Sequence, residues 1–203
     1  MDMPKPGEAH KRLGAFVGEW TGPETMFPAP WDPVGGKAMA RVVNRWIIDG
    51  FAVVQDYEQR KAGKVVFRGH GVIWFDPAKQ EYVMNWWDSI GGSGGQYRGT
   101  FDGSILRLSS PMPQGGHSRT SWNFDSSGGY SFNMEISGDG QTWQPAMLGS
   151  YTRAAKKPAA KKPARPAAKR TAKAARKTRR ASPKLARRTK PASPKPSGGG
   201  RKR

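Results

Sequence analysis

The sequence predicts an all-β fold: an antiparallel up-and-down barrel of about ten strands, preceded by a short helix and followed by a disordered basic tail. Alternating apolar and polar side chains indicate the strands, most clearly from Tyr130 to Ser137. The connections are short and rich in Gly, and they include the hairpin signals Asp49-Gly50 and Asp102-Gly103. Such connections leave no room for crossover helices, and closure of the sheet removes both exposed edges.

The elements are expected in a simple order within a domain at 8–153, behind a flexible arm at 1–7. Leu13, Phe16 and Val17 form one apolar face and predict a helix over Glu8–Val17. Prolines in the segment 28–36 exclude regular pairing there. Strands are expected at 18–27, 37–48, 51–60, 65–76, 81–88, 96–102, 104–110, 117–125, 129–137 and 142–153.

Residues 154–203 carry the whole net charge of the chain. The chain has 35 Lys and Arg against 15 Asp and Glu, and 15 of each kind lie within 1–153, so the tail holds 20 basic residues and no acidic one. The tail also lacks aromatic residues. Such a segment repels itself and buries too little apolar surface to offset its ordering entropy, so we expect it to be disordered.

The expected partner of this tail is duplex DNA or RNA. Duplex DNA carries one charge per about 1.7 Å, so the tail cations match roughly 34 Å of duplex. Without aromatic side chains that stack on bases, binding should be independent of sequence. The alternatives are a tail that solubilises the protein, targets it, or contacts the ribosome or an anionic membrane. The candidate nucleic-acid contacts are Lys156, Lys157, Lys161, Lys162, Arg165, Lys169, Arg170, Lys173, Arg176, Lys177, Arg179, Arg180, Lys184, Arg187 and Arg188.

A proline-free run between Pro166 and Pro183 is rich in good helix formers. Once its charges are neutralised on phosphates, we expect it to form a helix with one basic face. The tail resembles the C-terminal tails of linker histones and of bacterial histone-like proteins. Its Ser-Pro-Lys triplets, beginning at Ser182 and Ser193, are similar to units of those tails. The resemblance implies phosphate or minor-groove contact and phosphorylation at these serines. With nucleic acid as its partner, the protein is expected to be cytoplasmic and nucleoid-associated, or nuclear in a eukaryote, where the Lys/Arg clusters would act as an import signal.

The folded domain also resembles a known group. A helix, then Gly18-Glu19-Trp20 at the start of the first strand, then an up-and-down meander, is similar to lipocalin-like (calycin) barrels. The motifs Pro30-Trp31-Asp32-Pro33 and Asp139-Gly140-x-Thr142-Trp143 resemble a bacterial family of unknown function within that group. The resemblance covers 8–153. It implies that Arg153 of the last strand lies over Trp20 at the closed end, and it brings no catalytic residue.

A barrel of this size can enclose a small ligand. Aromatic side chains on the strands, with polar residues beside them, point to a site for a small apolar or aromatic molecule. The opposing interpretation is that these tryptophans simply pack the core. The candidate cavity residues are Trp46, Trp74, Trp86, Trp122, Asn44, Gln55, Asn85 and Arg119.

The sequence offers little for catalysis or metal binding. It has no Cys, and His10, His70 and His117 show no metal-ligand spacing. A haem held by His70 or His117 is the alternative that related barrels suggest. Gly91–Gly95 lacks the ending of a phosphate-binding loop and is expected to be a hairpin tip. We therefore expect a binding protein with no metal and no cofactor rather than an enzyme, and no membrane span.

Overall fold

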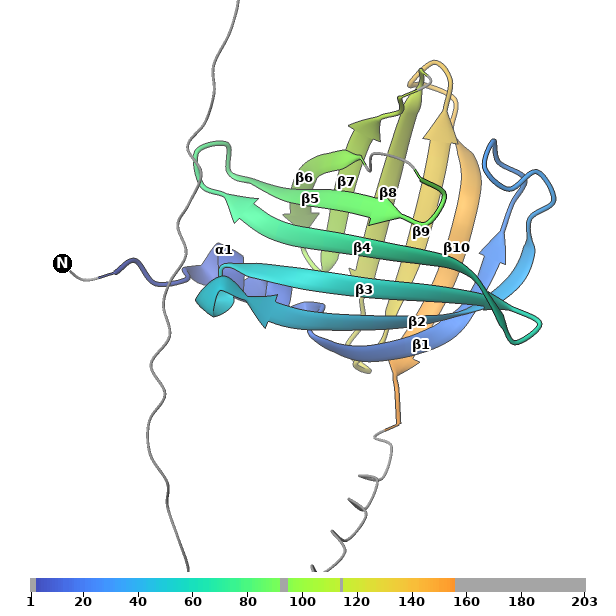
Figure 1. The fold of residues 1–203 in the computed structure, drawn as a ribbon. Coiled ribbons are helices and arrows are strands. Elements are labelled where there is room, and N and C mark those ends of the chain that lie inside the picture. The colour runs from blue at the N-terminus through green and yellow to red at the C-terminus, as the bar shows by residue number, and fades with distance from the viewer. Residues whose placement is uncertain (1–2, 92–94, 114, 156–203) are drawn as a thin grey trace, which may run out of the picture. The chain divides into compact units, whose positions relative to one another are not determined.

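The protein is described by a computed structural model that covers residues 3–91, 95–113 and 115–155 (Figure 1). Its helical elements are α1 (Glu8–Arg12), η1 (Leu13–Ala15) and η2 (Ile48–Gly50). Its strands are β1 (Gly18–Met26), β2 (Gly36–Ile47), β3 (Ala52–Lys61), β4 (Lys64–Asp76), β5 (Glu81–Asp88), β6 (Gln96–Asp102), β7 (Ile105–Pro111), β8 (His117–Phe124), β9 (Tyr130–Ser137) and β10 (Gln144–Arg153). Each strand end lies within two residues of its expected place.

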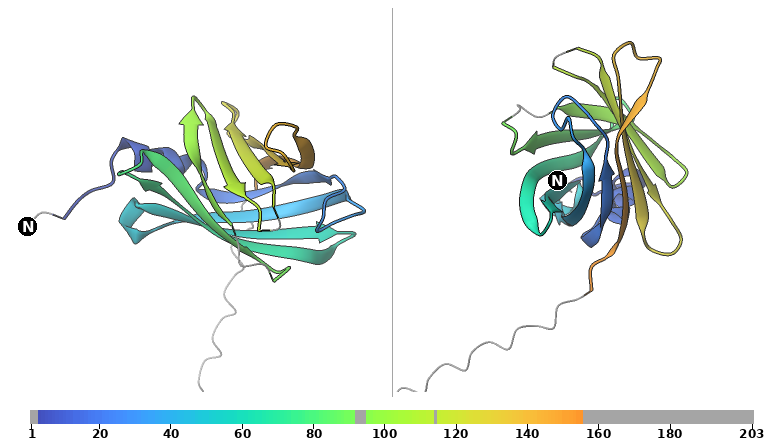
Figure 2. Two further views of the ribbon diagram at one scale, coloured as in Figure 1. Left: turned by 90° about the horizontal axis from the view of Figure 1, so that it is seen from above. Right: turned by 90° about the vertical axis from the view of Figure 1, so that its right-hand side faces the viewer.

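The ten strands form one closed antiparallel barrel in which every strand pairs with its neighbours in the chain. The barrel closes where β1 pairs with both β2 and β10 (Figure 2). In this register Trp20 lies between Val42 and Arg153. None of the ten described strands has an open edge, which is the physical advantage of closure over an open sheet. The predicted all-β up-and-down barrel is therefore confirmed.

The N-terminal helix is shorter than expected. The α-helix ends at Arg12, and the chain tightens into the 3₁₀ turn η1 instead of continuing to Val17. The tighter turn places Leu13 and Phe16 three residues apart on one side, and both are fully buried. Phe16 packs edge-on against Phe124, with ring centroids 4.8 Å apart. The helical segment thus covers one end of the barrel, and its last turn follows that packing rather than α-helical propensity.

The connection at Asp49-Gly50 also differs from a tight two-residue hairpin. It is the 3₁₀ turn η2, and Ile48, Asp49 and Gly50 all have positive φ angles. The Asp-Gly signal therefore located the turn between β2 and β3 correctly. Ile48 is exposed there. Because its φ angle is positive, this β-branched residue has a backbone conformation that favours glycine.

Side chains that point inward fill the barrel with apolar and aromatic groups. On β2, for example, Ala38, Ala40, Val42 and Asn44 are buried while the residues between them are more exposed. The buried core cluster consists of Leu13, Phe16, Trp20, Ala40, Val42, Val53, Tyr57, Ile73, Tyr82, Met84, Leu106, Leu108, Trp122, Tyr130, Phe132 and Tyr151. Within the parts of the chain that the structure describes, no helix has the length and hydropathy of a membrane span.

Candidate functional site

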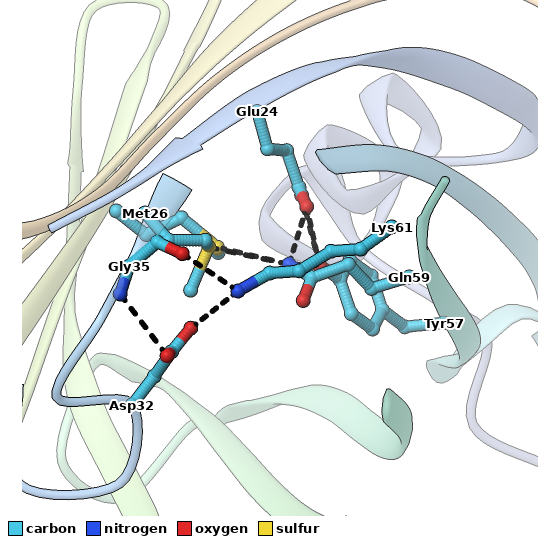
Figure 3. A network of polar contacts seen from close by, with 8 residues as sticks. Glu24, Met26, Asp32, Gly35, Tyr57, Gln59 and Lys61 are labelled. Carbon is cyan, nitrogen blue, oxygen red and sulfur yellow. Dashed lines mark hydrogen bonds and ion pairs between the residues drawn. The ribbon is translucent and has the colours of Figure 1, made fainter. Parts of the chain in front are cut away.

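A carboxylate lies inside the barrel. Glu24 is on the inward-facing side of β1, in the same alternating set as Trp20, Gly22 and Met26, and only 1% of its surface is exposed. Tyr57 Oη lies 2.9 Å from Oε1 and 2.7 Å from Oε2, and Gln59 Nε2 donates to Oε2 at 2.7 Å (Figure 3). Tyr151 Oη donates to Oε1 from the opposite side of the seam. Along the chain, the six strands from β4 to β9 separate Tyr57 and Gln59 from Tyr151, yet all three side chains meet at one carboxylate.

The tyrosines around Glu24 are held in their neutral form. Burial is the main cause that raises the pKa of Tyr57, Tyr130 and Tyr151 well above the usual value, and the negative charge of Glu24 raises each pKa further. Tyr130 stacks on Tyr151 with ring centroids 4.6 Å apart, which holds the Tyr151 ring in place. The hydroxyls of Tyr57 and Tyr151 therefore remain hydrogen-bond donors to Glu24 at neutral pH.

No basic side chain neutralises Glu24 among residues 3–91, 95–113 and 115–155, since none forms an ion pair with it there. Lys61, the base drawn beside the cluster in Figure 3, donates instead to Asp32 Oδ2 at 2.7 Å and to the Gly35 carbonyl at 2.9 Å. The hydrogen bond from Lys61 lowers the pKa of Asp32. The charge on Glu24 is therefore met by neutral donors alone.

A row of thioethers continues from this cluster around the inner wall. Gln59 Nε2 lies 3.2 Å from the sulfur of Met26 and 3.9 Å from that of Met147. In the strand register Met26 faces Met147, Met147 faces Met134, and Met134 faces Thr120. Thr120 is 8% exposed, and its hydroxyl has no hydrogen-bond partner in the described structure. The row thus runs from a buried carboxylate to a buried hydroxyl that lacks a partner.

Three aromatic side chains at the end of the barrel opposite the N-terminal helix remain partly accessible to solvent. Phe67, Trp86 and Tyr97 pack against the core but are only half-buried. Gly69 leaves room for Trp86, because a Cβ atom at Gly69 would overlap the indole ring. Tyr97 accepts a hydrogen bond from Ser118 at 3.3 Å, and burial raises its pKa. Apolar rings therefore line the end of the barrel opposite the N-terminal helix.

The predicted cavity residues divide into two groups. Trp122, Asn44 and Gln55 are buried in the interior, and Trp86 lies at its half-buried end. Asn44 donates to the Phe16 carbonyl at 2.8 Å, so it anchors the helical segment. The structure thus brings these four side chains to the inside of the barrel.

The prediction was wrong for Trp46, Trp74, Asn85 and Arg119, which do not line the interior. Trp46 is 39% exposed and lies at the barrel rim beside Gly14. Trp74 follows the buried Ile73 and therefore points outward, where its register partners on β3 and β5 are buried apolar residues.

Asn85 and Arg119 also lie on the outer face of the barrel. Asn85 accepts a hydrogen bond from the exposed Gln96 at 3.1 Å. Arg119 pairs with Glu135 at 2.7 Å and lies over the ring of Trp143. Both positions follow from strand alternation, since their neighbours Met84 and Thr120 point inward.

The predicted closing pair lies at the helical end. The guanidinium carbon of Arg153 is 4.3 Å from the ring centroid of Trp20, and the two residues face each other in the register of β1 and β10. The Trp20 indole donates to the Phe16 carbonyl at 2.7 Å. This pair therefore joins the first strand, the last strand and the helical segment.

The histidines lie away from the interior. His10 on α1 packs edge-on against Phe51 and Phe75, and His117 is exposed at the start of β8. His70 lies on the outer face, 2.8 Å from Asp56, in a groove of about 490 Å³ over β2–β5. The described residues contain no cluster of metal-ligand side chains.

The charges of that outer groove pair with one another. Asp56 also contacts Arg45 at 2.9 Å, and Glu58 bonds Arg60 and Arg68. These hydrogen bonds lower the pKa of Glu58, the bond from Arg60 most. The groove is thus a solvated face of matched charges, as expected for two acidic residues at alternate positions of one strand.

Sequence reasoning missed the cluster around Glu24. A signal was present, because Trp20 was expected inside and the period of two then places Glu24 inside as well. The same rule places Tyr57 with Gln59, and Tyr151 with Arg153. The predicted tail contacts, from Lys156 to Arg188, the helix between Pro166 and Pro183, and the tip of Gly91–Gly95 lie partly or wholly outside the described residues.

Comparison with known proteins identifies a family but no activity. The model of the family described as "Protein of unknown function (DUF1579)" matches residues 5–153, which includes the stretch 8–153 whose motifs resembled a family of unknown function. The crystal structure of Rv2717c from M. tuberculosis is similar in fold, with a TM-score of 0.55, 14% sequence identity, and coverage of 73% of this chain and 99% of that one. No curated protein matches the chain.

Proposed function

The chain belongs to the DUF1579 family, and from that starting point we propose that it is a ligand-binding barrel tethered to duplex nucleic acid by its basic tail. The observation that carries the proposal is the segregation of charge. Residues 1–153 are neutral overall, and the net charge of +20 belongs to residues 154–203. Counterion release from DNA by such a segment favours binding without a reading of the bases.

The ion pairs of the barrel support the assignment of nucleic-acid binding to the tail. Most of its basic side chains are already paired with acids on the barrel surface, so they offer little free positive charge to a polyanion. The paired residues are Lys11, Arg41, Arg45, Arg60, Lys61, Arg68, Arg98, Arg107 and Arg119. The tail has no acidic residue with which to pair. Nucleic-acid affinity should therefore reside in the tail.

The proposal assigns a binding role and no reaction. The barrel would carry its ligand to the nucleoid in the cytoplasm of a bacterium, or into the nucleus of a eukaryote. The second candidate is a small-molecule-binding barrel whose tail only solubilises or targets it, and the buried Glu24 cluster favours a barrel ligand under either proposal. The two candidates differ in one measurable quantity, the affinity of the tail for duplex DNA.

The test is a salt titration of duplex binding by the full chain. If about ten tail cations engage phosphates, the logarithm of the binding constant should fall with a slope near −9 against the logarithm of salt concentration. Truncation after Arg153 should abolish binding. Unchanged affinity after truncation, or a slope shallower than about −3, would overturn the proposal.

A matched pair of triple variants sharpens this test. Lys169→Gln, Lys173→Gln and Lys177→Gln together should make the slope shallower by about 3, since each phosphate contact contributes roughly one counterion. The same change at three barrel lysines, Lys37, Lys64 and Lys79, should leave the slope unchanged. An equal effect of the two sets would show that the barrel, not the tail, contacts the duplex.

A further inference from the structure

We infer that the barrel interior binds a small organic cation with an aromatic or apolar body, and that Glu24 is its counter-charge. The inference rests on the part of the proposed function that gives the barrel a ligand, and it adds the charge and the recognising residue. It is independent of whether the tail binds nucleic acid.

The charge of Glu24 carries the argument. Glu24 is 1% exposed and contacts Tyr57, Gln59 and Tyr151, all of which are neutral. Removing a carboxylate from water is costly unless a positive charge or strong hydrogen bonds offset it. Within the described residues the cluster supplies hydrogen bonds but no cation, so a positively charged ligand would complete it.

The carboxylate also has acceptor capacity left. Its two oxygens offer about four lone-pair sites. Tyr57 has a single proton that lies within reach of both oxygens, so the protein supplies one donor each from Tyr57, Tyr151 and Gln59. One acceptor site therefore remains for a donor such as an ammonium group.

A second, independent observation places polar ligand chemistry on the same inner wall. Thr120 is 8% exposed and its hydroxyl lacks a partner, although buried hydroxyls are normally hydrogen-bonded. It joins Glu24 through the row of Met134, Met147 and Met26, whose last two sulfurs contact Gln59. A ligand that follows this row would meet the carboxylate at one end and the hydroxyl at the other.

The remaining surface suits an apolar body. Methionine adapts to irregular shapes, and its sulfur packs well against aromatic rings. Phe67 and Trp86 are half-buried and pack against the core, so they offer aromatic surface to an apolar body. Aromatic faces also attract cations, which adds to the preference set by Glu24.

Three probes of one shape and different charge test the inference on the full chain: phenethylammonium, 2-phenylethanol and 3-phenylpropionate. Binding is followed by tryptophan fluorescence, which reports only on the barrel because the tail has no aromatic residue. Isothermal titration calorimetry gives the affinities. We expect phenethylammonium to bind at least about tenfold more tightly than the other two, as for a hydrogen bond to a charged partner.

Two variants assign the preference to Glu24. Glu24→Gln should reduce the advantage of the cation to less than about twofold, while the same change at Glu135 on the outer face, E135Q, should leave it intact. If E24Q does not fold by circular dichroism, Gln59→Lys keeps the carboxylate and supplies its counter-charge from the protein. Q59K should then lose phenethylammonium binding.

Equal affinity for the three probes, or unchanged cation binding in both Glu24→Gln and Gln59→Lys, would overturn the inference. A barrel ligand of another charge would still agree with the proposed function. Absence of binding by all three would overturn it as well. Neither result affects duplex binding, which the truncation and salt titration measure separately.

Discussion

Arg153, the last residue of β10, covers the indole of Trp20 at the start of β1, with its guanidinium carbon 4.3 Å from the ring centroid. The same guanidinium donates to the Val17 carbonyl at 2.9 Å, so it also satisfies the backbone where the helical segment enters the barrel. Gly18 lies against the Arg153 guanidinium and has a φ of +140°. A Cβ atom at this position would overlap Arg153. One exposed cation therefore closes the seam between the two ends of the barrel.

Arg153→Met should lower the free energy of unfolding by about 1–2 kcal/mol, because it removes a cation–π contact and a hydrogen bond but keeps the aliphatic stem. Urea unfolding followed by far-ultraviolet circular dichroism measures this. Arg107→Met is the control, since Arg107 forms only an exposed pair with Asp102 and should cost less than about 0.5 kcal/mol. Equal losses would show that the Arg153–Trp20 contact adds no stability.

Tyr151→Phe should destabilise the barrel by about 1.5–3 kcal/mol, because it removes a donor from the buried carboxylate of Glu24. Tyr82→Phe is the matched change, since Tyr82 donates to a neutral carbonyl, that of Ala9, at 2.9 Å. That variant should cost about 1 kcal/mol. Thermal unfolding of both variants compares them, and a loss for Tyr151→Phe no greater than for Tyr82→Phe would contradict a charged acceptor at Glu24.

High pH should unfold the barrel through its tyrosines. Burial raises the pKa of all five: Tyr57, Tyr82, Tyr97, Tyr130 and Tyr151. Because the folded protein then holds these protons more tightly than the unfolded chain, stability is fully present below pH of about 10 and is lost as the pH rises above it. Each fully buried tyrosine contributes a slope of up to roughly 1.4 kcal/mol per pH unit.

Phenolate absorbance and circular dichroism, recorded together, test this dependence on pH. In the folded protein both signals should change in one cooperative step above the titration of the urea-unfolded chain. Phenolate formation near pH 10 without loss of structure would show that the tyrosines are accessible to solvent.

Gly99→Ala should cost about 1–3 kcal/mol, because the added methyl group would overlap the carbonyl oxygen of Arg107 on the neighbouring strand. Backbone atoms of a paired strand move less readily than the end of a side chain. Gly138→Ala is the control, since its methyl group would enter open space at a residue with no positive φ, and it should change stability by less than about 0.5 kcal/mol. The midpoints of urea unfolding compare the stabilities of the two variants, and equal midpoints would contradict a clash at Gly99.

The strands and their ends could be predicted because local patterns carry them. Alternation and Gly-rich turns depend on neighbouring residues, and the positions of β5 and β6 were met without error. The helical segment and the turn at Ile48–Gly50 were predicted less well, because burial of Leu13 and Phe16 decides the first and backbone geometry the second. Trp74 was misplaced because residue type was weighed above strand parity, whereas Trp46 has the inward parity of Asn44 but lies at the exposed rim.

By itself the sequence determined that a neutral domain of alternating strands precedes a tail with all the net charge, since composition and short-range periodicity need no folded structure to be evaluated. Only the tertiary structure decided which side chains meet inside the barrel. Glu24, Tyr57 and Tyr151 lie far apart in the chain, and closure of β1 onto β10 is what brings the second hydroxyl, that of Tyr151, to the carboxylate. The neighbours of the buried Glu24 carboxylate are set by closure of the barrel, and no local sequence pattern specifies them.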